Sequence, residues 1–172
     1  MASNIFPELK PELFGEKADD VDASLKSLER TIPLSDSYRQ VLLTFGGAIY
    51  FYKIVVFKSD EPSPLNDKDG YQALDILYGL GNGENSIEQK IEQYEGELPP
   101  SFAPIGEAPG GNLICMNDAG AVYLWDHESP RGGKEVWRIA ESMDDFLGRL
   151  KLDNSPPVNT DGIIESESWL DI

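Results

Sequence analysis

The stretch from Phe102 to Glu128 constrains the fold more than any other part of the chain. Apolar, aromatic and β-branched residues fill its runs 113–117 and 121–125, whereas Gly, Pro and Asn cluster between the runs. Glycine and asparagine tolerate the positive φ angles of tight turns, and Pro fixes its own φ. This alternation predicts a strand, a turn and a second strand. We expect the stretch to form the core hairpin of the protein.

Helical and strand periodicity organises the remainder of the chain. Apolar residues at positions 21, 25, 28 and 32 recur with helical spacing, and similar patterns follow near residues 35–45, 86–98 and 142–150. Polar residues that can cap these helices are Asp20 or Asp22, Ser35, Ser86 and Ser142. We expect Pro99 and Pro100 to end the third helix. The runs 48–57, 74–78 and 135–140 have the composition of strands.

These elements predict a single α+β domain. A chain of 172 residues suits one domain and can bury a substantial core. We expect residues 1–20 to be a loosely attached lead-in, residues 21–152 the domain, and residues 153–172 an acidic tail. The tail carries five acidic residues and no basic one, and it is either disordered or an arm docked through Trp169 and Leu170.

The charge of the chain is strongly one-sided. Its formal net charge is −17 and its pI about 4.2. Such a field repels phosphate backbones and anionic membrane surfaces, so we expect no nucleic acid and no membrane as partner. It would attract a protein partner with a basic surface. The alternative is that the charge serves only solubility.

The chain has one cysteine, Cys115, so it cannot form an internal disulfide. Its first residues lack the basic and apolar regions of a secretory signal. No apolar run approaches the ~20 residues of a membrane span. We therefore expect a cytoplasmic protein.

Two loops resemble ligand motifs without completing them. The glycines at 79, 81 and 83 suggest a phosphate loop, but Glu84 stands where the dinucleotide pattern needs glycine, and the Lys-Ser or Lys-Thr of a P-loop is absent. Residues 67–70 resemble part of a calcium loop, but Leu65 and Ile76 occupy ligand positions. We expect a turn there, and no cofactor.

The sequence gives little support for catalysis or metal binding. His127 is the only histidine, and a zinc site would need it together with Cys115 and carboxylates that lack the spacing of metal motifs. Asp126, His127 and Ser129 are close in sequence, but a catalytic triad is a spatial arrangement that a short run does not establish. We expect no enzyme and no metal site. A small hydrolase that uses Asp126 and His127 is the weaker alternative.

Tyr123 and Trp125 lie two residues apart on one predicted strand, so they share a face of it. Two interpretations are open for this aromatic pair. It packs in the core or at its rim, or it anchors a contact surface, a role that Tyr and Trp often take in interfaces.

Four blocks of sequence resemble the SUKH superfamily in their order and approximate spacing. They are residues 34–47, residues 102–106 with 110–112, residues 122–128, and residues 139–147. The resemblance covers residues 21–152. Two positions depart from the family's pattern: Ser35 stands where proline is usual, and Met143 where phenylalanine is common. Both are tolerable at a cap and at a packing position.

The resemblance implies a central antiparallel-rich mixed sheet flanked by helices, and no catalytic residues. The superfamily contains bacterial immunity proteins that neutralise polymorphic or contact-dependent toxins, often nucleases, and a fungal regulator of cell-wall synthesis. We therefore expect an immunity protein that blocks the active site of a cognate toxin. A regulatory or scaffolding module is the alternative. The expected contacts are acidic and aromatic residues, namely Asp60, Glu61, Asp67, Asp69, Tyr123, Trp125, Asp126 and Glu128.

Overall fold

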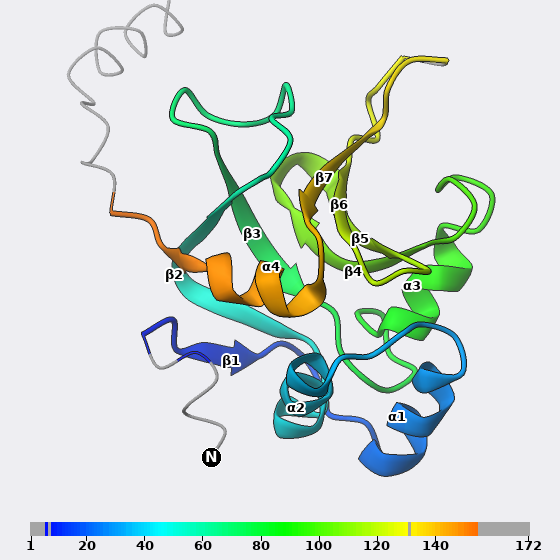
Figure 1. The fold of residues 1–172 in the computed structure, drawn as a ribbon. Helices are drawn as coiled ribbons and strands as arrows, with labels where there is room; N and C mark the ends of the chain where they lie inside the picture. Colours follow the sequence, from blue (N-terminus) through cyan, green and yellow to red (C-terminus); the bar gives the residue numbers. More distant parts are fainter. Residues whose placement is uncertain (1–5, 7, 131, 155–172) are drawn as a thin grey trace, which may run out of the picture.

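One antiparallel sheet runs through the computed structural model, which describes residues 6, 8–130 and 132–154 (Figure 1). Seven strands lie side by side in chain order, from β1 to β7, and a short β8 also pairs with β2. The strands are β1 (Pro11–Leu13), β2 (Ile49–Lys58), β3 (Tyr71–Leu77), β4 (Phe102–Ala108), β5 (Asn112–Asn117), β6 (Val122–Trp125), β7 (Val136–Ala140) and β8 (Lys151–Leu152). With its helices, this sheet gives the α+β fold that the sequence predicts.

In the described part of the chain, four α-helices accompany the sheet, and each begins after a predicted cap. They are α1 (Val21–Glu29), α2 (Asp36–Phe45), α3 (Ile87–Gln93) and α4 (Met143–Arg149). The side chains of Asp20, Ser35, Ser86 and Ser142 accept hydrogen bonds from backbone N–H groups three residues ahead. Helix α3 is shorter than expected, since it ends well before Pro99.

The stretch predicted as a core hairpin is a meander of three strands, β4, β5 and β6. A 3-10 turn at Pro109–Gly111 joins the first two, and Gly110 and Gly111 have φ angles of 83° and 80°. The second turn is held by Asn117, whose Oδ1 accepts from the N–H groups of Ala119 and Ala121. The centre of the core lies in these strands, where Ile105, Ile114 and Leu124 are fully buried.

Strand β2 gains two short partners that sequence patterns did not reveal. Residues 11–13, expected to belong to a loosely attached lead-in, pair with Ile49–Phe51 as β1. Strand β8 pairs with Val55 and Val56 further along β2. Between these contacts the register of β2 with β3 shifts from Tyr50↔Ile76 to Val55↔Leu74, which leaves an irregular segment at residues 51–54.

The helices leave one end of the sheet to loops. In Figure 1, α1 and α2 lie together at the bottom, and α4 lies in front of the sheet. Helix α4 holds its place through Phe146, whose ring meets Phe57 of β2 edge to face at 5.3 Å. At the top, the loop 59–70 and the described residues of the loop 126–135, which exclude residue 131, project beyond the strands. Among the described residues, no helix is long and apolar enough to cross a membrane.

Candidate protein-binding surface

The loop end is the surface formed by loop 59–70 and the described residues of loop 126–135, together with Tyr123 and Arg138. Loop 59–70 lies against β7, because the N–H of Asp60 donates to the carbonyl of Ile139 (2.9 Å) and that of Glu61 to the carbonyl of Arg138 (3.0 Å). The Glu61 carboxylate accepts from the N–H of Arg138 at 3.0 Å. The loop therefore occupies backbone groups of β7 that an edge strand would otherwise expose.

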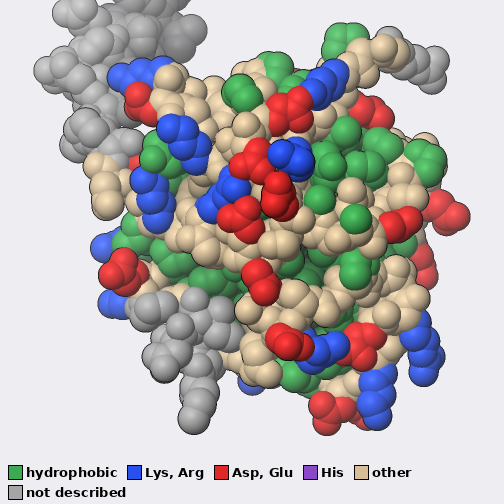
Figure 2. Space-filling view, in the orientation of Figure 1, with side chains coloured by type: hydrophobic (Ala, Val, Ile, Leu, Met, Phe, Trp, Pro, Cys, Tyr) green, Lys and Arg blue, Asp and Glu red, His purple; other side chains and the backbone are tan. Residues whose placement is uncertain are grey.

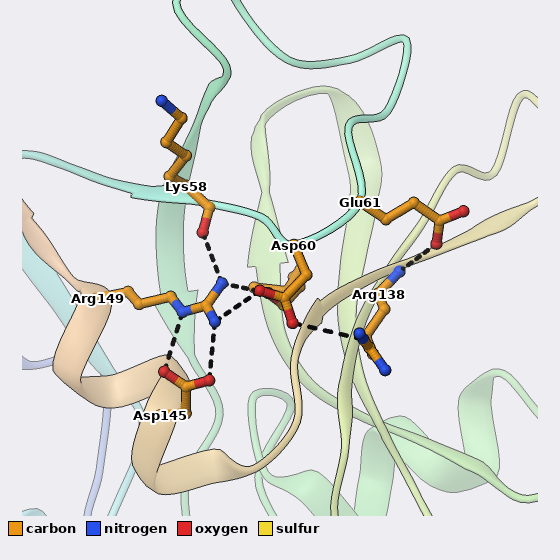
Figure 3. Close-up of polar contacts among 7 residues, drawn as sticks. Lys58, Asp60, Glu61, Arg138, Asp145 and Arg149 are labelled. Atoms are coloured by element: carbon orange, nitrogen blue, oxygen red, sulfur yellow. Dashed lines mark hydrogen bonds and ion pairs between the residues drawn. The ribbon is translucent and has the colours of Figure 1, made fainter.

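Arg149 of α4 is the hub that fixes this loop (Figure 3). Its guanidinium donates to the carbonyls of Lys58 and Ile139 at 3.1 and 2.6 Å. It also donates to Asp60 Oδ1 at 2.7 Å and, through two nitrogens, to both oxygens of Asp145 at 3.1 and 2.8 Å. The planar donor fork of arginine suits such multiple contacts. One side chain thus joins α4, β7 and the start of loop 59–70.

The contact between Arg149 and Asp145 shifts the pKa of both residues. Hydrogen bonding to Arg149 lowers the pKa of Asp145, and the same contact raises the pKa of Arg149. Around the hub, Arg138 lies 3.4 Å from Asp60, and Lys134 forms an ion pair with Glu61. The carboxylates of Asp60 and Glu61 are therefore largely compensated within the molecule. They stabilise the position of the loop and contribute little uncompensated negative charge to the surface.

The structure brings three of the expected contact residues together. Asp60, Glu61 and Tyr123 line a shallow surface hollow with Arg138, which faces Tyr123 across the β6–β7 ladder. The Tyr123 ring is half-buried and meets Phe102 edge to face at 5.0 Å. Figure 2 shows the mixed acidic and basic side chains gathered on this side of the molecule.

Trp125 does not take part in that surface. Its side chain is only 6% exposed, and its ring meets Tyr94, the residue that caps α3, edge to face at 5.9 Å. Of the two interpretations of the aromatic pair, core packing holds for Trp125, while Tyr123 lies at the rim. We leave Trp125 out of the candidate surface because a covered ring offers no contact area.

The expected acidic residues of the loop tips lie outside the hollow. Asp67 shapes a turn, since its Oδ1 accepts from the N–H groups of Asp69 and Tyr71 at 2.9 and 2.8 Å. Asp126 shapes another by accepting from the N–H of Glu128 at 3.0 Å. Asp69 is exposed, and the Glu128 side chain is 82% exposed. Asp69 and Glu128 are therefore exposed carboxylates of these two loops.

His127 and Cys115, the residues that could serve catalysis or bind zinc, are both engaged in contacts within the fold. His127 Nδ1 lies 3.0 Å from Oδ1 of the buried Asn112, and its ring stands beside Gly111. Cys115 is fully buried, and burial raises its pKa, which keeps the thiol protonated. No group of three or more His, Cys, Asp or Glu residues within the described parts of the chain could hold a metal ion.

Sequence reasoning missed the basic members of the surface. Arg138, Lys134 and Arg149 were not predicted, although Asp145 and Arg149 are spaced i, i+4 on a predicted helix, a spacing that favours ion pairs. Their link to Asp60 had no sequence signal, because residues 60 and 149 are distant along the chain.

The fold and this surface define an α+β protein whose sheet is covered by loops at one end. The chain belongs to the SMI1/KNR4 family (SUKH-1), whose model matches residues 17–149. A relative is a SPbeta prophage-derived protein of Bacillus subtilis (strain 168) that carries the name YokK and is described as uncharacterized. It is 34% identical over 143 residues, which cover 76% of this chain and 74% of the relative. The comparison with solved structures gave no match.

Proposed function

We propose that this protein is a cytoplasmic immunity protein that binds a cognate toxin through the loop end and blocks the toxin's active site. Membership of the SMI1/KNR4 family supports this function. The resemblance to the SUKH superfamily implies a protein that neutralises a toxin by binding it and that needs no catalytic residues of its own. The observation that carries the proposal is the arrangement of the loop end. The two loops carry exposed carboxylates, and a shallow hollow is lined by Tyr123, Asp60 and Glu61.

The electrostatics of the loop end suit a basic partner. Asp69 and Glu128 project from tips whose backbones are held by Asp67 and Asp126. Their negative charge is part of the chain's net charge of −17. A nuclease holds phosphates in a basic groove, so an acidic surface would be attracted to that groove and would compete with the nucleic acid.

The hub beneath the loop end supports the same function. Arg149 ties loop 59–70 to α4 and β7, so the hollow is organised before a partner arrives. A preorganised surface loses less conformational entropy on binding. Tyr123 would supply the aromatic anchor that hot spots often contain.

The test uses the product of the neighbouring gene as the candidate toxin. The variant Asp69→Lys/Glu128→Lys reverses two exposed carboxylates, one in each loop. We expect it to weaken binding about tenfold or more at low salt by slowing association. Cells that express the toxin should then lose protection. The matched control, Glu92→Lys/Glu95→Lys, makes the same charge change at exposed residues near α3 and should bind like the unmodified chain.

Two outcomes decide against the proposal. If the neighbouring product is bound equally well by both double variants, the loop end is not the contact. If that product is not toxic and is not bound at low salt, the immunity role fails. A regulatory or scaffolding role would then be favoured by capture of signalling proteins that leaves cell survival unchanged.

A further inference from the structure

A pocket lies away from the loop end, beside the starts of α1 and α3. It has a volume of about 430 Å³ and is formed by residues 14–19, Ala48 and residues 80–86. Residues 14–19 lie between β1 and α1, and residues 80–86 lie between β3 and α3. In Figure 1, α1 lies at the bottom, whereas loop 59–70 projects at the top. We call this site the lower pocket, and it shares no lining residue with the hollow of the loop end.

The first wall of the lower pocket is the segment 14–19, which the backbone holds at two points. The N–H of Phe14 donates to the carbonyl of Ala48 at 2.7 Å, and the N–H of Ala18 donates to the carbonyl of Gly46 at 2.7 Å. These hydrogen bonds fix the wall in the free protein. A ligand therefore meets a preformed surface, which costs less conformational entropy than a surface that must be ordered on binding.

The second wall is the loop 80–86, which belongs to the glycine-rich stretch that resembles a phosphate loop in sequence. The N–H of Gly81 donates to Oγ of Ser24 in α1 at 2.7 Å, which ties the loop to that helix. The N–H of Ser86 donates to the carbonyl of Gly83 at 3.1 Å and closes the loop on itself. Both walls of the lower pocket are thus held by hydrogen bonds within the fold.

The charge of the lower pocket suits a cation and opposes a phosphate. Its charged lining residues are Glu16, Asp19 and Glu84, with Lys17 as the basic one. All four are exposed, and none of them forms an ion pair or a side-chain hydrogen bond with another described residue. The hollow of the loop end differs, because its carboxylates have basic partners. Uncompensated carboxylates around a pocket attract positive charge and repel negative charge.

An exposed aromatic ring stands at the same pocket. Phe14 lines it and is 40% exposed, while its ring meets Tyr50 edge to face at 5.8 Å. A guanidinium forms hydrogen bonds to carboxylates through its planar donor fork, and its flat face stacks on aromatic rings. The apolar stem of an arginine can lie along Ala18 and Leu80, which also line the pocket. Carboxylates and an accessible ring together therefore favour arginine as the ligand.

We propose that the lower pocket binds an arginine side chain carried by a protein partner. The guanidinium pairs with the carboxylates of Glu16 and Glu84 and stacks on the exposed part of the Phe14 ring. A lysine ammonium gains less at such a site, because it has neither a planar fork of donors nor a flat face. The inference does not rest on the proposed immunity function, since the pocket and the loop end are separate surfaces.

Amide NMR spectra of the full chain, recorded during titration with a capped peptide, test this site. The probe is a tripeptide with arginine between two glycines, and its control carries citrulline, a neutral analogue of arginine, at the same place. At low salt we expect the arginine peptide to cause saturable shift changes at residues 14–19 and 80–86. The citrulline peptide should bind severalfold more weakly, and added salt should weaken binding of the arginine peptide.

Two charge variants separate the pocket from the general charge of the chain. Glu16→Gln/Glu84→Gln removes two carboxylates of the lower pocket and should weaken binding of the arginine peptide severalfold. Asp69→Asn/Glu128→Gln removes the same amount of charge at the loop end. This matched control should bind the peptide like the unmodified chain.

A third variant obstructs the pocket without changing its charge. Gly83 lines the pocket, and a Cβ built on it would meet no atom within 4 Å. Gly83→Phe therefore introduces a ring there without a clash at Cβ, and it should lower the affinity for the arginine peptide severalfold. The amide spectrum shows whether each variant is folded. If Gly83→Phe does not fold, the carboxylate variant and the map of shift changes decide.

The proposal is overturned if the arginine peptide causes no saturable shift changes at the lower pocket, or if the citrulline peptide binds equally well. It is also overturned if the loop-end variant weakens binding as much as Glu16→Gln/Glu84→Gln, because net charge alone would then explain the attraction. These results leave the immunity proposal untouched, since its own test uses the neighbouring gene's product and the loop end.

Discussion

Arg149 donates a hydrogen bond to Asp60 at 2.7 Å, and this contact joins two segments separated by 89 residues. It connects the last turn of α4 to the loop that leaves β2. The same guanidinium also satisfies the carbonyls of Lys58 and Ile139, so one side chain of α4 reinforces the backbone hydrogen bonds that hold loop 59–70 against β7. The candidate protein-binding surface thus rests on a residue that does not itself lie in the hollow.

Replacement of Arg149 should lower stability. Arg149→Met keeps much of the aliphatic stem but removes every hydrogen bond of the guanidinium, and charged hydrogen bonds contribute about 1.5–3 kcal/mol each when they are well formed. Because the network is partly exposed, we expect a net loss of about 2 kcal/mol in the free energy of unfolding, measured in urea. Arg30→Met, at an exposed position, is the control. A change as small as that of the control would contradict the hub.

The stability of the protein at acid pH should also depend on Arg149. Hydrogen bonding to Arg149 holds the pKa of Asp145 below its ordinary value. A carboxyl whose pKa is lower in the folded state stabilises it above the unfolded-state pKa, about 3.9, and this contribution is lost as the pH falls through the folded pKa. In Arg149→Met, NMR titration should show the pKa of Asp145 rising toward its ordinary value. An unchanged pKa would argue against the contact.

Substitution of Glu107 should destabilise the protein more than substitution of Lys90. The Lys90 side chain is only 7% exposed, with its Nζ 3.7 Å from Glu107, and Glu107 also accepts from the Tyr78 hydroxyl at 2.7 Å. Burial raises the pKa of Tyr78, so the hydroxyl stays a donor. Glu107→Ala leaves a buried charge uncompensated and should cost about 3 kcal/mol.

Lys90→Met is the comparison for that substitution. It replaces the ammonium with an apolar group of similar length, so it should cost less than about 1 kcal/mol. Thermal and urea unfolding measure both variants. Equal losses would show that the charge of Lys90 does not depend on Glu107.

Cys115 should be unreactive in the folded protein. The residue is fully buried in β5, and burial raises its pKa, while the thiolate is the reactive form. A thiol reagent at pH 8 should therefore label it only at the rate at which the protein opens, and promptly in urea. Rapid labelling of the native chain would contradict the packing of β5.

Local signals in the sequence accounted for most elements of the fold. Helix starts at Ser35 and Ser142 were predictable because a capping side chain bonds within its own first turn. The strand at residues 48–57 was predictable from its run of β-forming residues. The same local reasoning overextended α3, since the helix ends at Gln93 without a proline nearby.

Contacts between distant segments were beyond such reasoning. Strand β1 has three residues, including Pro11, and exists only because Ile49–Phe51 offer it a partner. Strand β8 has two residues and depends likewise on β2. Predicted surface acids such as Asp60 found basic partners that lie far away in the sequence. Burial of Trp125 depended on Tyr94 of a separate element, so its strand pattern could not distinguish an anchor from a core ring.

Hydrogen exchange of the complex with the neighbouring gene's product tests the central claim most directly. The account predicts that binding protects amides in loops 59–70 and 126–135, and around Tyr123, while α1 and α2 at the other end keep the exchange rates of the free protein. Protection confined to α1, α2 or the loop 79–86, with unchanged exchange at the loop end, would contradict it.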